Sequence, residues 1–162
     1  YMRFPSDARI YMDMGWQEGG NGWLMVQFLR MVYSRLLSHG LQDLKNIFYH
    51  EDPIGIHNEK DWSRRIKMPL VFLYGKFIPK LSKLKIEVIN KNIHGKNTTF
   101  LIPELYIPRK LSFTAISSNF EINKPDIATI NCDRELIRHK KGKVVIKAYY
   151  HGKKCKKKLY ID

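Results

Sequence analysis

The residues whose types could carry out chemistry lie in two short segments of the first half of the sequence. His57 comes directly before Asn58, a residue that favours the N-cap of a helix, and Asp61 follows at a spacing from which a carboxylate can bond back to the cap. A capped helix holds the preceding residue in place, as a catalytic imidazole requires. Glu18 lies upstream in a glycine-rich loop, and Asp13 is the alternative carboxylate. A carboxylate that orients an imidazole lets it act as general base for a serine hydroxyl.

The elements that must position these residues alternate between strands and helices. Alternating apolar residues predict a strand over 9–15, and a second strand is predicted over 44–49. Apolar residues at helical spacing predict a helix over 23–39 and another over 59–74, with a kink or break at Pro69. This order indicates the end of a parallel α/β sheet, in which functional groups gather at the carboxyl ends of the strands.

The apolar spacing also marks one face of each predicted helix. In the first helix the residues that recur at helical spacing are Leu24, Phe28, Met31, Val32 and Leu36. In the second helix the predicted buried stripe is Trp62, Ile66, Leu70 and Leu73.

Two segments of this half resemble a known enzyme family. The segments over 9–19 and 55–65 are similar to the acid loop and the histidine loop of esterases related to enterochelin esterase, feruloyl esterases and acetylxylan esterases. The resemblance covers about residues 5–76 and implies a partial α/β-hydrolase fold with a remnant of its parallel sheet. It implies that His57 is the catalytic base and that Glu18 is the triad acid, with Asp13 as the alternative. Trp16 stands where this family has a small residue.

The serine that such a triad requires does not occur in its usual motif, because the sequence contains no Gly-x-Ser-x-Gly. We therefore expect the nucleophile, the oxyanion-hole loop and the earlier strands to precede Tyr1 in a longer parent protein. The chain by itself is then expected to be inactive, since loss of the serine removes most of the rate of a triad enzyme. It is also expected to expose apolar surface that the earlier strands would cover.

The charge distribution changes near residue 77. Residues 1–76 carry 10 Lys+Arg and 8 Asp+Glu, whereas residues 77–162 carry 19 and 7. A step of this size indicates a domain boundary, so we predict one domain over 1–76 and a second over 77–162. The positive charge of the second domain favours weak contact with polyanions or a cell envelope.

Short strands separated by turn residues are predicted throughout the second domain. They lie at 84–89, 99–102, 111–116, 127–130, 135–138, 144–150 and 154–161. His151 and Gly152 are predicted to form a two-residue hairpin turn. The segments 111–119, 125–130 and 141–153 resemble a bacterial immunoglobulin-like domain of group 2. The resemblance implies an all-β immunoglobulin-like sandwich that serves as a spacer, an adhesion module or an appendage of a secreted enzyme.

The lysine run over 153–158 alternates between the two faces of its strand, so we predict that it coats a sheet edge and prevents unwanted pairing. It lacks the interleaved aromatic residues of a base-stacking platform and does not predict specific nucleic-acid binding. Cys132 and Cys155 form either one bridge or two free thiols.

The remaining features restrict the classes of function. His94, His139 and His151 are scattered and predicted to lie in surface loops, and no metal or cofactor site is predicted. No run of 18 apolar residues occurs, so no membrane span is predicted, and no signal peptide is evident.

The function predicted from these features is that of a fragment of a carboxylic ester hydrolase, secreted or at the cell surface by resemblance alone. Its substrate would be a small ester or an acylated polysaccharide. The alternative is a non-enzymatic adhesion or spacer protein at the cell surface with an inert hydrolase remnant.

Overall fold

A computed structural model describes residues 4–5, 7–19, 22–75, 80–108 and 111–162. The chain divides into two compact units, each described here by itself. The first unit comprises Tyr1–Lys80 and Ile107–Phe113, and the second comprises Leu81–Tyr106 and Thr114–Asp162. The predicted boundary between residues 76 and 77 lies outside the described residues.

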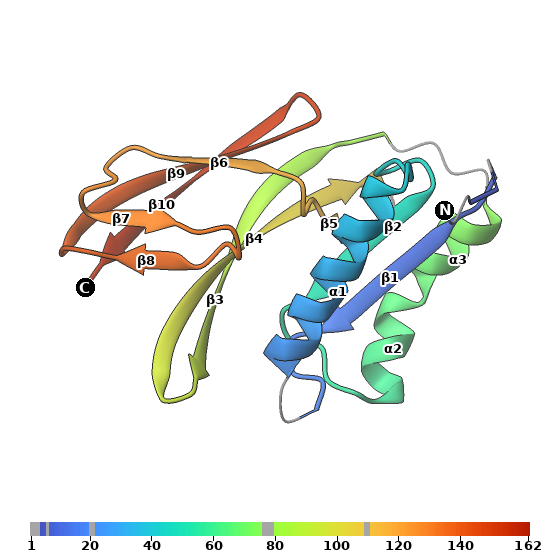
Figure 1. The fold of residues 1–162 in the computed structure, drawn as a ribbon, viewed down its shortest axis with the longest axis horizontal. Helices are drawn as coiled ribbons and strands as arrows, with labels where there is room; N and C mark the ends of the chain where they lie inside the picture. The colour runs from blue at the N-terminus through green and yellow to red at the C-terminus, as the bar shows by residue number, and fades with distance from the viewer. Residues whose placement is uncertain (1–3, 6, 20–21, 76–79, 109–110) are drawn as a thin grey trace. The chain divides into compact units, whose positions relative to one another are not determined.

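Among the described residues, the helices belong to the first unit, and strands occur in both (Figure 1). In chain order the elements are β1 (Ile10–Gly15), α1 (Gly22–Ser38), β2 (Ile47–Asp52), α2 (Glu59–Arg65), α3 (Lys67–Tyr74), β3 (Lys83–Ile93), β4 (Lys96–Ile107), β5 (Leu111–Thr114), β6 (Asn119–Ile122), β7 (Ala128–Ile130), β8 (Leu136–Arg138), β9 (Gly142–Tyr150) and β10 (Lys153–Ile161).

The first unit is built on the parallel pair of β1 and β2, which run from the pairing of Ile10 with Ile47 to that of Gly15 with Asp52. Residue Phe48 of β2 lies at the centre of its core. The Phe48 ring centroid is 4.7 Å from that of Phe72 and 4.5 Å from that of Phe113. This aromatic cluster is fully buried and accounts for the burial of β2, because large rings remove the most apolar area from water.

The predicted fold class, a partial α/β-hydrolase followed by an immunoglobulin-like sandwich, is wrong. Strands make up 46% of the structure and helices 22%, so the chain is mostly β, and antiparallel sheets dominate. In the described part of the chain, β1 and β2 are the one pair of strands that run parallel. The alternation of strand and helix predicted this local pair correctly. It could not establish further parallel strands, because those depend on contacts far apart in sequence.

Helix α1 is confirmed where the apolar spacing predicted it, but its apolar stripe faces solvent. The side that packs inward carries Val26, Arg30 and Tyr33. The exposed apolar residues of the opposite side are Leu24, Met25, Phe28, Met31 and Val32, each between 46% and 65% exposed. Apolar spacing therefore identified the helix, while the narrow sheet beneath it covers only the other side.

The second predicted helix is broken, as the proline indicated. α2 ends at Arg65, Ile66 forms the joint, and α3 begins at Lys67. Pro69 lies in the first turn of α3, where its missing N–H has no helical partner to lose and its ring no longer clashes with the Arg65 carbonyl. The predicted buried stripe is wrong, since Trp62, Ile66 and Leu70 are at least 40% exposed.

The second unit consists of antiparallel strands. β9 lies between β10 and β6, while β3 pairs with β4 and β7 pairs with β8 in separate sheets. An immunoglobulin-like sandwich has two sheets, and in the described residues the strands of this unit divide among three. The short strand β6 was not predicted, although its apolar residues Phe120 and Ile122 alternate with Asn119 and Glu121.

Two hairpins of this unit use the same dipeptide turn. His151 and Gly152 join β9 to β10 with φ of 42° and 74°, as predicted, and His94 and Gly95 join β3 to β4 with φ of 50° and 81°. Positive φ at both central residues defines the turn that matches the twist of the strands. His94 and His151 are therefore explained by turn geometry, and both are exposed.

None of the helices in the ranges that the structure describes has the length and hydropathy needed to cross a bilayer.

Candidate acid–histidine site

The loops that follow β1 and β2 are joined by backbone contacts at the carboxyl ends of the two strands. Trp16 N donates to Asp52 O and Gln17 N donates to Gly55 O, each at 2.9 Å. A Cβ on Gly15 would overlap the carbonyl oxygen of Gly55, and a Cβ on Gly55 would lie 2.9 Å from the Gly15 Cα. Glycine at both positions therefore permits the close approach of the two loops.

This approach brings together the two residues that the sequence analysis selected. His57 Nδ1 lies 3.3 Å from Glu18 Oε2, slightly beyond the usual hydrogen-bond range. The Glu18 side chain is 13% exposed and that of His57 is 69% exposed. Because Nδ1 faces the carboxylate, Nε2 on the other side of the ring is the atom that can exchange a proton with a reacting group. The catalytic roles of the two residues stay predictions.

The histidine is held by its neighbours in the chain. Asn58 caps α2 by accepting the Asp61 N–H at 2.8 Å, as predicted. The Asp61 carboxylate accepts the Ile56 N–H at 2.8 Å instead of bonding back to the cap. Residues on both sides of His57 are thus fixed to the first turn of the helix, and its ring packs edge-on against Trp62 with centroids 4.7 Å apart.

Arg65 orients the acid, and the sequence analysis did not select it. Its Nη2 donates to Glu18 Oε1 at 2.7 Å and its Nη1 donates to Asp13 Oδ1 at 3.1 Å. Its Nε lies 3.7 Å from Asp52 Oδ2, and the side chain is only 4% exposed. An arginine at the end of a short surface helix carries no signal of this role, because the three carboxylates come from distant parts of the sequence.

The two candidate acids differ in their surroundings. Burial favours the neutral form of Glu18, but the hydrogen bonds from Arg65, Gly15 and His57 outweigh it and lower the pKa of Glu18 below its ordinary value. Burial raises the pKa of Asp13 in spite of the attraction of Arg65. Glu18 is therefore the carboxylate that stays ionised beside the imidazole, while Asp13 is paired with Arg65. Two carboxylates with diverging pKa values suit different roles.

A second charged network lies in the core of the unit and was also not predicted. Glu51, which is 1% exposed, accepts from Arg30 at 2.7 and 2.8 Å, from Trp16 Nε1 at 3.0 Å and from the Tyr49 hydroxyl at 2.8 Å. Both oxygens of the carboxylate accept hydrogen bonds from these side chains, as a buried charge requires. This network explains the tryptophan at position 16, whose ring is fully buried and whose N–H is used.

Among the described residues, no group of three or more His, Cys, Asp or Glu side chains is arranged to hold a metal ion. Cys132 and Cys155 are both free thiols. His139 is exposed and its Nε2 lies 2.9 Å from the Thr129 hydroxyl, within the second unit.

The chain was compared with protein-family models, with curated proteins and with solved structures, and no match was found in any of the three.

Proposed function

We propose that Glu18 and His57 are the acid and the general base of a serine-type carboxylic ester hydrolase. The observation that supports this most directly is the 3.3 Å approach of His57 Nδ1 to Glu18 Oε2 across the carboxyl ends of two adjacent parallel strands. The carboxylate would hold the imidazole with its proton on Nδ1 and leave Nε2 ready to accept a proton.

In this proposal each residue has one task. Nε2 of His57 removes the proton of a serine hydroxyl as its oxygen attacks the ester carbonyl, and then returns the proton to the departing alcohol. The acyl group passes to water in the reverse sequence. Glu18 stabilises the charged imidazolium, and Arg65 is a positioning residue that keeps Glu18 ionised and correctly turned.

The proposal requires a serine from a polypeptide segment other than residues 1–162, because this sequence lacks Gly-x-Ser-x-Gly. Within the described residues, no serine, threonine or cysteine side chain is bonded to the His57 ring. The exposure of the ring is consistent with such a partner, since Nε2 must be reached from outside the unit. The substrate class remains small esters or acylated polysaccharides.

The state of the imidazole can be tested in this chain alone. Long-range ¹H–¹⁵N spectra are expected to show the Nδ1–H tautomer of the His57 imidazole, and Glu18→Ala is expected to shift the population towards the Nε2–H form. The other five histidines serve as internal controls. An Nε2–H form in the unaltered chain, unchanged in Glu18→Ala, would show that the carboxylate does not orient the ring.

Catalysis is tested in the complete gene product that contains this sequence. We expect p-nitrophenyl acetate hydrolysis and labelling of a serine by a fluorophosphonate, and His57→Ala should lower the rate by roughly 10³-fold or more. Residues 1–162 alone should show no turnover above their own His57→Ala variant. If the complete product neither hydrolyses esters nor is labelled, the enzymatic proposal fails and the alternative of a non-enzymatic surface protein is favoured.

A further inference from the structure

The outer face of the three-stranded sheet in the second unit carries a row of positive charge. Side chains that pair across antiparallel strands lie on the same face, and the register joins Lys154 to Tyr149 and Lys156 to Lys147. The lysine face, as we name it, comprises Lys143, Lys147, Lys154, Lys156 and Lys158, all exposed. The alternate residues of β9, among them Val144, Ile146 and Ala148, are buried in the core behind it.

This positive charge is almost uncompensated by the protein. β6, β9 and β10 contain one acidic residue, Glu121, and its carboxylate lies 3.7 Å from Lys147 Nζ. In the described ranges no ion pair joins any other lysine of the face to an acidic side chain. Lysines on alternate positions of β10 stand roughly 7 Å apart. A regular row of this length matches an extended polyanion better than a single small anion.

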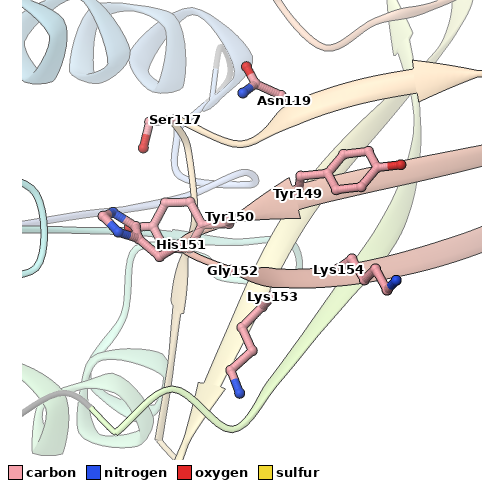
Figure 2. A pocket seen from close by; sticks show the side chains of 8 residues that line it. All are labelled: Ser117, Asn119, Tyr149, Tyr150, His151, Gly152, Lys153 and Lys154. Carbon is pink, nitrogen blue, oxygen red and sulfur yellow. The ribbon is translucent and has the colours of Figure 1, made fainter.

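The face is also hollowed. One pocket of about 440 Å³ is lined by Lys147, Tyr149, Lys154, Cys155 and Lys156. A neighbouring pocket of about 370 Å³ shares Tyr149 and Lys154 with it, and its other lining residues are Ser117, Asn119, Tyr150, His151, Gly152 and Lys153 (Figure 2). The two hollows share Tyr149 and Lys154 near the end of the β9–β10 hairpin, and we call them together the strip around Tyr149.

The polar groups of the strip indicate which kind of polyanion fits. The Tyr149 hydroxyl donates to Glu121 Oε2 at 2.9 Å, so a carboxylate lies among the lysines. That carboxylate can accept hydrogen bonds from sugar hydroxyls, as can the Asn119 amide oxygen. Single-stranded nucleic acid would require several exposed rings or arginine planes for base stacking. The lysine face has no arginine, Tyr149 is half-buried, and the one well-exposed ring on this face, Tyr160, pairs with Lys143 at the far end of β10 from the hairpin turn.

We propose that the lysine face and the strip around Tyr149 bind an anionic polysaccharide. The lysines supply point charges for its carboxylate or sulfate groups, and Tyr149 with Asn119 contacts an uncharged part of a sugar ring. This inference rests on the second unit alone and is independent of the proposed ester hydrolysis.

The test is a binding titration of the full chain with polygalacturonate and with heparin, using neutral dextran and a 20-residue oligothymidylate for comparison. We expect both polysaccharides to bind and dextran not to bind. Lys154→Gln/Lys156→Gln/Lys158→Gln should weaken polysaccharide binding by at least about tenfold and reduce its salt dependence. The matched control removes three exposed lysines of the first unit, Lys45, Lys60 and Lys67, in the same way and should change affinity less than about twofold.

A second variant separates a built site from general charge attraction. Tyr149→Val keeps the charge and the strand propensity, and we expect it to weaken polysaccharide binding several-fold. Equal losses in the two triple-lysine variants, or no effect of Tyr149→Val, would overturn the proposal in favour of nonspecific attraction. Tighter binding of the oligothymidylate than of either polysaccharide would overturn it in favour of nucleic acid. Circular dichroism of each variant verifies that the fold is retained.

Discussion

Among the described residues, eleven of the twelve large apolar side chains that are well exposed belong to the first unit, and only Tyr160 belongs to the second. Buried charges show the same division. The buried charged residues Arg30, Glu51, Asp52 and Arg65 are all in the first unit, whereas the buried polar residues of the second are threonines and a serine. The second unit thus closes its own apolar core and carries its charge outside, while the first uses ion pairs inside and leaves apolar faces in solvent.

The contrast follows from sheet size. Antiparallel strands of the second unit bury alternate residues on one face and satisfy their backbone groups from neighbouring strands. The two parallel strands and three short helices of the first unit provide fewer apolar contacts. Specific ion pairs therefore contribute more to holding its loops together. The candidate site lies in the first unit, which depends on those ion pairs. Arg65 joins the loops of this unit and also orients Glu18.

The largest expected effect comes from breaking the buried network of the first unit. Glu51→Gln leaves the Arg30 charge buried without its partner, and we expect a loss of about 3–5 kcal/mol in the free energy of unfolding. All three tryptophans, Trp16, Trp23 and Trp62, lie in the first unit, so tryptophan fluorescence during denaturation reports this unit alone. The exposed Glu59→Gln is the control. Equal stability of the two variants would contradict the importance of the network.

The second unit should respond to loss of apolar packing instead. Leu105 is fully buried in β4, and Leu105→Ala is expected to cost about 2–5 kcal/mol by leaving a cavity. Hydrogen exchange of the β3 and β4 amides measures the loss, and the exposed Lys141→Ala should leave exchange unchanged. Slow exchange that persists in Leu105→Ala would mean that this core is not what stabilises the unit.

A smaller effect is expected from Glu18 at acid pH. Its folded pKa lies below its ordinary value of 4.5, so its contribution to stability is present above pH 4.5 and is lost as the pH falls through the folded pKa. Glu18→Gln should lower the free energy of unfolding by about 1.5 kcal/mol at neutral pH. It should also reduce the loss of stability that occurs as the pH falls below 4.5, as measured by tryptophan fluorescence during denaturation.

Asp13 supplies the matched comparison, because its pKa shift has the opposite sign. Its folded pKa is raised above its ordinary value of 3.8, so its ionisation disfavours the folded state as the pH rises through that window. Asp13→Asn should therefore steepen the rise in stability with pH. If Glu18→Gln and Asp13→Asn reduce the loss of stability at acid pH to the same extent, the two carboxylates do not differ as described.

The smallest effect on stability is expected on the exposed side of α1. Phe28→Ser and Met31→Ser should each change the free energy of unfolding by less than about 0.5 kcal/mol, since both side chains are already more than half exposed. Val26→Ser on the buried side should cost several times more. Sedimentation should show less self-association in the two exposed variants. Losses like that of Val26→Ser would mean that this side of α1 is covered in solution.

Local features could be predicted from the sequence because neighbouring residues determine them. Helix α1, the Asn58 cap, the break associated with Pro69 and the His151–Gly152 turn all follow from side chains within a few positions of each other. The pairing of Glu18 with His57 was predicted from the rule that loops after parallel strands meet at one edge.

Only the tertiary structure decided what depends on residues far apart in the chain. Apolar spacing marked the stripes of α1 and α2 but could not show that solvent, rather than a sheet, lies against them. Nothing near Arg65 in the sequence indicates its contacts with Asp13, Glu18 and Asp52, which lie up to 52 positions away. The number and direction of the strands likewise depend on which distant segments pair. Local chemistry therefore determined the elements of this protein, whereas burial and charge pairing, which are properties of the packed chain, determined the fold and the surroundings of the site.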